Sequence, residues 1–295
     1  MAFLGVAAIW SILFALTANY TSALVPFIDG GKGIPEIYKG YFDQQIAKQA
    51  ASAVSRACSA GKRKMEVNFP PVPNLEEVRF GTPLNQKFGT EVIARDLKVK
   101  GGYKPGSNVS RQLVGFSNVF WAKKICPAVG GGLLGGNTVT ALSGEQVTFP
   151  QVQDAGGMTI GPLNSRATMA KKGDPVILIN PGGEESWERV YLNLGSPTGP
   201  FIVLNNAYST TYDLGNKRGF EEVYYLKRIS KGWVFRSFPG PWQAYLEKPN
   251  GKLELLQSYK TKPSLKEVAT LVREESFRRF AIGNDRWSKG LGERL

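Results

Sequence analysis

Four consecutive aliphatic residues at positions 176–179 (Val-Ile-Leu-Ile) constrain the fold more than any other feature of this chain. They are followed at once by Asn-Pro-Gly at 180–182, residues that end strands in tight turns. A strand that is apolar on both sides must be covered on both faces, and this occurs in sheets that carry helices on each side. The segment therefore predicts a central strand of a layered α/β sheet.

Segments with helical and with β periodicity alternate along the chain, which is typical of an α/β fold. After Gly219, short strand-like runs follow one another with only turn residues between them, as in an antiparallel meander. Ser264 and Glu267 then form a capping-box pattern that starts a closing helix. We expect further helices from about residue 35 to Gly61 and over 84–97, 165–171 and 184–194, and strands at 64–69, 118–125, 139–142, 158–162, 176–180, 201–205, 224–229, 233–238, 243–248 and 253–259. The expected fold class is α/β: a layered, mostly parallel or mixed sheet with flanking helices, a C-terminal antiparallel meander and a closing helix.

The first residues resemble a targeting segment. Residues 3–18 are apolar except for two hydroxyl residues, which matches a signal-peptide core and is short for a bilayer span of about 20 residues. Residues 22–26 resemble the junction of bipartite plastid presequences of algae with secondary plastids, with cleavage between Ala23 and Leu24. An ordinary secreted protein and an uncleaved membrane anchor are the alternatives. We expect a signal peptide over 1–23, a short transit or linker segment over 24–35, a single α/β domain over 36–280 and a tail over 281–295.

Histidine is absent from all 295 residues. A Ser-His-Asp or Cys-His nucleophile and a His-ligated zinc are therefore excluded, although chemistry based on carboxylates or lysine is not. The two cysteines, Cys58 and Cys126, fit no metal-binding spacing, and burial as small apolar residues explains them better. We expect a protein that is not an enzyme and has no metal or cofactor.

The net charge of +13 favours an anionic partner. The basic residues are spread along the chain and form no arm or tail of the kind that binds nucleic acid, so we expect no nucleic-acid partner. Peripheral contact with an anionic membrane surface remains compatible with this charge.

A glycine-rich segment, 130–135, matches the dinucleotide-binding pattern G-x-G-x-x-G formally. That pattern needs a following helix to receive the pyrophosphate, whereas residues 137–142 have β character. Asn137 also stands where a phosphate-binding loop has its lysine. We interpret the segment as a flexible surface loop.

Two strand ends carry the candidate ligand-binding residues. Asn180 and Pro181 end the most apolar strand, and Asn205 and Asn206 end the next. Ligands of open α/β sheets bind at the carboxyl ends of strands, where these amides could converge. The alternative is that they only form turns, for which Asn and Pro are well suited.

Aromatic residues are frequent in the expected meander. We interpret them mainly as core and edge cover, but any that are exposed would mark a surface for a protein partner. The candidates for such a partner surface are Trp233, Phe238, Trp242 and Tyr245.

Four short motifs in a fixed order carry a family resemblance. They are residues 60–67, 176–181, 233–245 and 262–265. Together they resemble a plant and algal plastid family with a domain of unknown function, which includes the photosystem II assembly factor "low photosystem II accumulation 3" and the C-terminal domain of a chloroplast adenylate kinase. The resemblance covers residues 36 to about 275, and the Gly-rich insertion at 130–136 departs from the simpler members.

The resemblance implies a stromal or thylakoid-associated chloroplast protein without a catalytic motif. It would assist assembly or biogenesis of photosystem II through protein contacts, with thylakoid membrane-protein clients or their insertion machinery as partners. The alternative is a regulatory module that binds a nucleotide or tetrapyrrole through Asn180 and Asn205. A third reading, a secreted protein, requires a disulfide or a glycan at the Asn108 acceptor motif.

Overall fold

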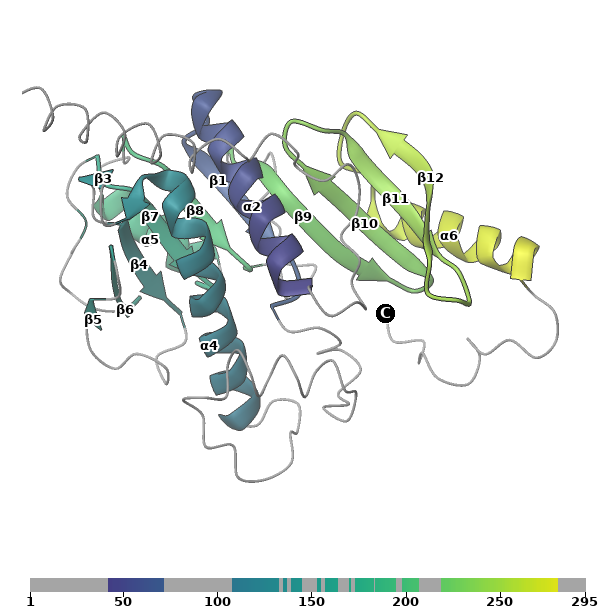
Figure 1. Cartoon of the computed structure of the whole chain (residues 1–295), viewed down its shortest axis with the longest axis horizontal. Helices are drawn as coiled ribbons and strands as arrows, with labels where there is room; N and C mark the ends of the chain where they lie inside the picture. The colour runs from purple at the N-terminus through teal and green to yellow at the C-terminus, as the bar shows by residue number, and fades with distance from the viewer. Residues whose placement is uncertain are drawn as a thin grey trace, which may run out of the picture. The chain divides into compact units, whose positions relative to one another are not determined.

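A ten-stranded mixed sheet with helices on both faces forms the fold (Figure 1). The computed structural model describes residues 42–71, 108–132, 135–136, 139–144, 153–154, 157–163, 170, 173–182, 184–194, 198–206 and 219–280. All of these belong to the unit Gly33–Leu295. The helices α2 and α4 lie in front of the sheet in Figure 1, and α5 and α6 lie behind it.

The elements follow one another as the alternating pattern predicts. The helices are α2 (Phe42–Ser59), α4 (Asn108–Ile125), the 3₁₀ turn η4 (Cys126–Val129), α5 (Glu184–Asn193) and α6 (Leu265–Phe280). The strands are β1 (Lys64–Asn68), β2 (Gly131–Gly132), β3 (Gly135–Gly136), β4 (Val139–Ser143), β5 (Gln153–Asp154), β6 (Met158–Pro162), β7 (Val176–Ile179), β8 (Phe201–Leu204), β9 (Glu221–Ile229), β10 (Gly232–Ser237), β11 (Trp242–Glu247) and β12 (Leu253–Tyr259).

The spatial order of the large sheet is β12-β11-β10-β9-β1-β8-β7-β4-β6-β5. Six neighbouring strands from β9 to β6 run parallel, and β10, β11 and β12 continue from β9 as an antiparallel meander. β7 lies between β4 and β8 and is fully buried, as its four aliphatic residues predict. The expected fold class is confirmed.

The front face of the sheet is covered by α2 and α4. Helix α2 buries Ala50, Val54 and Ala57 against this face and ends where Gly61 adopts a positive φ of 76°. The Lys62 N–H donates to the Ala57 carbonyl at 2.9 Å, which closes the helix end in the way that a glycine allows. Gly61 therefore caps the helix, as the sequence predicts.

The back face carries two separate apolar clusters. Under α5, the Trp187 ring packs edge-on against Phe220, with centroids 5.1 Å apart, next to the buried Phe201. Under α6, Val268 and Val272 pack on the buried faces of β10 and β11. The closing helix thus covers the meander, whereas α5 covers the cluster around Phe201 and Phe220.

One expected element is wrong. Residues 118–125, expected as a strand because of their β-branched and aromatic content, form the last part of α4. The helical period becomes clear once earlier residues are included, since Val114, Trp121, Ala122 and Ile125 are buried on one side of the helix. β-propensity is a weak signal that tertiary packing overrides.

Other differences are local. The glycine-rich segment follows η4 and not a strand, and Gly131–Gly132 pairs with Gly135–Gly136 as a short hairpin. The two-residue strand β5 was too short to predict. The helix expected over 84–97 and nearly all of that expected over 165–171 lie outside the described residues, as does the start of the first helix before Phe42. In the part of the chain that the structure describes, no helix has the length and apolar character to cross a membrane.

Candidate functional site

The strands β1, β8 and β7 are parallel neighbours, so their carboxyl ends meet at one edge of the sheet. Asn68 is the last residue of β1, Asn205 follows β8 and Asn180 follows β7. The sequence prediction that amides converge at this edge agrees with their placement. Their hydrogen bonds decide whether they are available to a ligand.

Asn205 joins three elements. Its backbone has a positive φ of 52°, and its side chain is 2% exposed. The amide oxygen accepts a hydrogen bond from the Phe69 N–H at 2.9 Å, and the amide nitrogen donates to Oδ1 of Asn118 on α4 at 2.7 Å. We refer to the bonds among Asn205, Asn118 and Phe69 as the amide latch. Both polar atoms of Asn205 are therefore used to hold β8, the end of β1 and α4 together.

The other candidates at this edge form a turn. Asn180 has a positive φ of 42°, and its N–H donates to the Leu204 carbonyl at 2.8 Å. Pro181 is buried after it. Oδ1 of Asn206 accepts a hydrogen bond from the Gly182 N–H at 3.0 Å, which ties the end of β8 to the turn after β7. The bonds of Asn180 and Asn206 described here match the turn-forming alternative.

Asn118 is a polar residue at this edge that the sequence interpretation missed. It is completely buried, and its side-chain nitrogen has no hydrogen-bond partner among the described residues. The missed signal is the helical spacing of Asn118 with the buried Trp121 and Ile125, which places it on the sheet-facing side of α4. A buried amide donor of this kind is the one group at this edge that favours an additional acceptor.

A buried polar strip lies across β1 and β9. Glu66 is completely buried, accepts a hydrogen bond from the Asn68 amide at 2.7 Å and stands opposite Glu222 in the parallel register. Nζ of Lys262 lies 2.6 Å from a carboxylate oxygen of Glu222 and 4.7 Å from the centroid of the Tyr225 ring. Lys262 precedes α6, so this ion pair fastens the start of the closing helix to the sheet. Burial of both carboxylates makes this a packing contact and gives no accessible acid or base.

The aromatic candidates for a partner surface lie mostly in the core. Trp233, Trp242 and Tyr245 are 3%, 3% and 7% exposed, and Phe238 is half-buried. Nε1 of Trp233 donates to Glu247 at 3.3 Å. Three of the four rings thus belong to the packed interior of the meander, and a partner surface has to be sought elsewhere.

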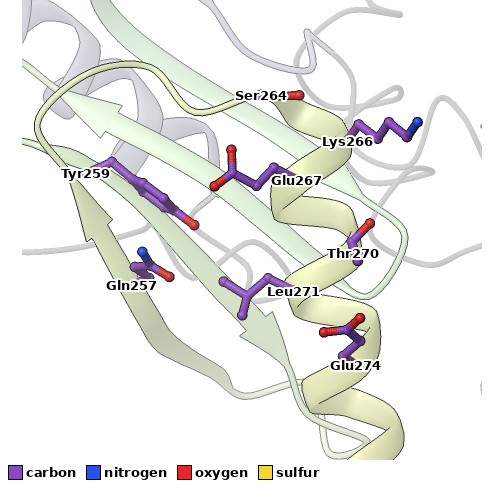
Figure 2. Close-up of a pocket in the computed structure, with 8 residues that line it drawn as sticks. All are labelled: Gln257, Tyr259, Ser264, Lys266, Glu267, Thr270, Leu271 and Glu274. Carbon is purple, nitrogen blue, oxygen red and sulfur yellow. The ribbon is translucent and has the colours of Figure 1, made fainter.

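An open groove lies between β12 and α6 and has a volume of about 500 Å³ (Figure 2). Glu267 and Leu271 point from α6 toward the strand that carries Tyr259, whereas Lys266 extends away from it. The residues that line the groove are Gln257, Tyr259, Ser264, Lys266, Glu267, Thr270, Leu271 and Glu274. Among the surface features described here, the groove is the one with the shape of a docking site.

Ion pairs hold the far end of this groove together. Glu254 on β12 lies 2.5 Å from Nζ of Lys248 and 2.6 Å from Arg279 on α6. Hydrogen bonds from these two side chains lower the pKa of Glu254 to about 2, so it stays charged at any physiological pH. Arg278 and Arg279 also pair with Glu275, at 2.7 Å and 2.8 Å. The last turns of α6 are therefore tied to the edge strand.

The cysteines do not form a reactive or metal-binding site. Both are free thiols, and burial raises the pKa of Cys58 and of Cys126. A thiol with a raised pKa is a poor nucleophile at neutral pH. Within the described ranges, no three acidic or sulfur-bearing side chains come close enough together to hold a metal ion.

Comparison with known proteins gives one match. The family model described as "Domain of unknown function (DUF1995)" matches residues 43–270. No curated protein and no solved structure matches the chain. The match covers all elements from α2 to the first turns of α6, so it spans the whole sheet.

Proposed function

The chain belongs to the family described as "Domain of unknown function (DUF1995)", and from this premise we propose that it is a non-enzymatic plastid protein that assists photosystem II assembly through protein contacts. The plastid role is supported by the resemblance of four ordered motifs to the plastid assembly-factor family and by the junction at residues 22–26. The proposed location is the chloroplast stroma or an association with the thylakoid.

The amide latch is the observation that most favours protein contacts over catalysis. Open α/β sheets generally bind ligands at the carboxyl ends of their strands, yet both polar atoms of the Asn205 side chain bind other parts of the protein. The groove beside β12 is by contrast open and lies at an edge of the sheet. A surface of this kind suits a polypeptide partner better than a small molecule.

The plastid address can be tested with fluorescent fusions. We expect residues 1–45, and separately the whole chain, to direct a fluorescent protein into the plastid of an alga with secondary plastids. Leu24→Ala should abolish plastid import, because the bulky residue after the cleavage site is proposed to direct the second import step. Fluorescence of both the wild type and Leu24→Ala in the secretory pathway would contradict the plastid proposal. In cells depleted of the protein, photosystem II should fall relative to photosystem I, and unchanged photosystem II would contradict the assembly role.

A second candidate function, a regulatory module for a nucleotide or tetrapyrrole, is favoured by one observation. The buried side-chain nitrogen of Asn118 has no partner among the described residues, and a ligand carbonyl, carboxylate or phosphate oxygen would satisfy it. A ligand that binds the folded state at a concentration of 100 times its Kd stabilises that state by about 2.7 kcal/mol. We expect this candidate, if correct, to raise the melting temperature with one of these ligands in the wild type and less in Asn118→Ala. An unchanged melting temperature with every nucleotide and tetrapyrrole would reject it.

A further inference from the structure

We propose that the groove between β12 and α6 binds an extended, basic peptide segment of a partner protein, which adds to the sheet as a strand beside β12. The inference rests on the proposed protein-contact function and names the class of partner. It does not depend on the plastid location, because each step is argued from the groove itself.

The edge of the sheet supplies the backbone contacts. β12 is the last strand of the sheet and pairs, among the described strands, with β11 alone. An edge strand offers unpaired N–H and C=O groups that an extended peptide can pair with. Natural edges are commonly protected by proline or lysine within the strand, and the sequence of β12, LELLQSY, contains neither. Leu255 on this strand is also 46% exposed.

Two carboxylates supply the charge. Glu267 and Glu274 line the groove, are exposed and, in the part of the chain that the structure describes, take part in no ion pair. The neighbouring Glu254 and Glu275 are by contrast both paired with arginine. The groove is lined by these two carboxylates and one basic residue, Lys266, so its local charge is negative and complementary to a basic partner, although the whole chain has a net charge of +13.

The charge of Glu267 acts inside the groove. Burial and then the nearby Glu267 carboxylate raise the pKa of Tyr259 on β12. Figure 2 shows the Glu267 side chain pointing from α6 toward that strand. The half-buried Leu271 lies on the same side of α6 one turn further on and provides an apolar contact. Phe277, 75% exposed, follows Glu274 by three residues and so continues its stripe on the helix.

The spacing of the carboxylates predicts the partner's pattern. Glu267 and Glu274 are seven residues apart on α6, which is about 10.5 Å along the helix axis. Side chains on one face of an added strand lie about 7 Å apart for residues i and i+2 and about 14 Å apart for i and i+4. Lysine and arginine side chains are long enough to bridge the difference between either of these distances and the spacing of the two carboxylates. We therefore expect basic residues at alternate positions of the segment.

The test uses fluorescence anisotropy with purified full-length protein and a fluorescein-labelled peptide that alternates lysine with valine. Glu267→Gln combined with Glu274→Gln should raise the Kd of this peptide about tenfold, from the loss of two exposed ion pairs. Glu275→Gln is the matched control for the single variant Glu274→Gln, because it also removes one charge from the same helix, but at a carboxylate that is already paired. It should change the Kd by about twofold or less. A second peptide, N-methylated at every backbone nitrogen, keeps the charge but has no N–H to donate to a strand edge and should bind much more weakly.

Three results would overturn the inference. The first is equal Kd values for the wild type and the double variant. The second is equal binding of the N-methylated peptide, which would show that charge alone attracts the probe. The third is a wild-type dimer that the double variant converts to a monomer in light scattering, since the groove would then bind a second copy of this chain. None of these results bears on plastid import, which the Leu24→Ala fusion decides separately.

Discussion

Gly232→Ala is expected to destabilise the folded protein by about 3 kcal/mol or more. Gly232 begins β10 and pairs with Leu246 of β11. A Cβ atom at this position would overlap the backbone carbonyl oxygen of Tyr245 and approach Cγ1 of Val272 on α6 to 3.0 Å. Overpacking of a core costs about 1–3 kcal/mol where side chains can adjust. Here the obstacle is backbone, so β10, β11 and α6 would have to separate.

Urea unfolding measures this effect as a lower midpoint with an unchanged slope. The control is Gly251→Ala in the exposed turn before β12, where φ is 77° and an added Cβ meets nothing within 4 Å. That substitution should cost only about 1 kcal/mol, from the left-handed backbone. Equal losses in the two variants would contradict the close approach of β10 to β11 and α6.

Local patterns explain why much of the sheet could be predicted. The expected bounds of β6 and β12 match the structure at both ends, because strand alternation and turn residues fix them within a short window. The closing helix begins directly after Ser264, and the Val268 N–H donates to the Ser264 carbonyl at 3.0 Å. The end of α2 was predicted in the same way, from Gly61, which adopts a positive φ there. Each of these features depends on neighbours in the sequence.

The order of the strands depends on distant neighbours and could not be predicted. β1 lies between β8 and β9, more than 100 positions later in the chain. No local pattern selects those two strands as its neighbours. The wrong strand prediction for 118–125 had a further consequence. Asn118 lies on helix α4, which brings its side chain to the carboxyl edge, and an expected strand at this position gives no reason to place it there. The sequence therefore predicted the edge at which the candidate amides lie, but not that the side-chain nitrogen of Asn205 donates to Asn118.

The interpretation of the meander aromatics mainly as core residues is confirmed for Trp233, Trp242 and Tyr245, but the local pattern could not show whether any of them would be exposed. Strand alternation puts Trp233 and Tyr245 on one face of the meander and Trp242 on the other. If one face of the meander were solvated, the aromatic rings on that face would be exposed. Here both faces are buried at these positions, and Trp242 packs 5.1 Å from Tyr225 under the closing helix. Exposure was thus decided by tertiary contacts that the alternation itself does not contain.

Asn205→Ala is expected to destabilise the protein by about 4 kcal/mol and to lower its melting temperature by about 10 °C. The substitution leaves the Phe69 N–H and the Asn118 oxygen without these partners, and each buried unsatisfied group costs about 1–3 kcal/mol. Alanine at a φ of 52° adds about 1 kcal/mol, because asparagine tolerates the left-handed backbone better. Asn206→Ala is the neighbouring control. It removes the acceptor of the half-buried Gly182 N–H and should cost less than Asn205→Ala, about 1–2 kcal/mol.

A double-mutant cycle separates the amide latch from the backbone effect. Asn118→Ala removes the side chain on α4 to which Asn205 donates, without touching the strained turn. If the side chains act as a pair, the double variant Asn118→Ala with Asn205→Ala should be about 1–2 kcal/mol more stable than the sum of the single losses predicts. Additive losses would show that Asn205 matters for its backbone and for Phe69 alone. In that case α4 would be held to the sheet by its apolar side chains, and the hydrogen bond between Asn118 and Asn205 would add nothing to that contact.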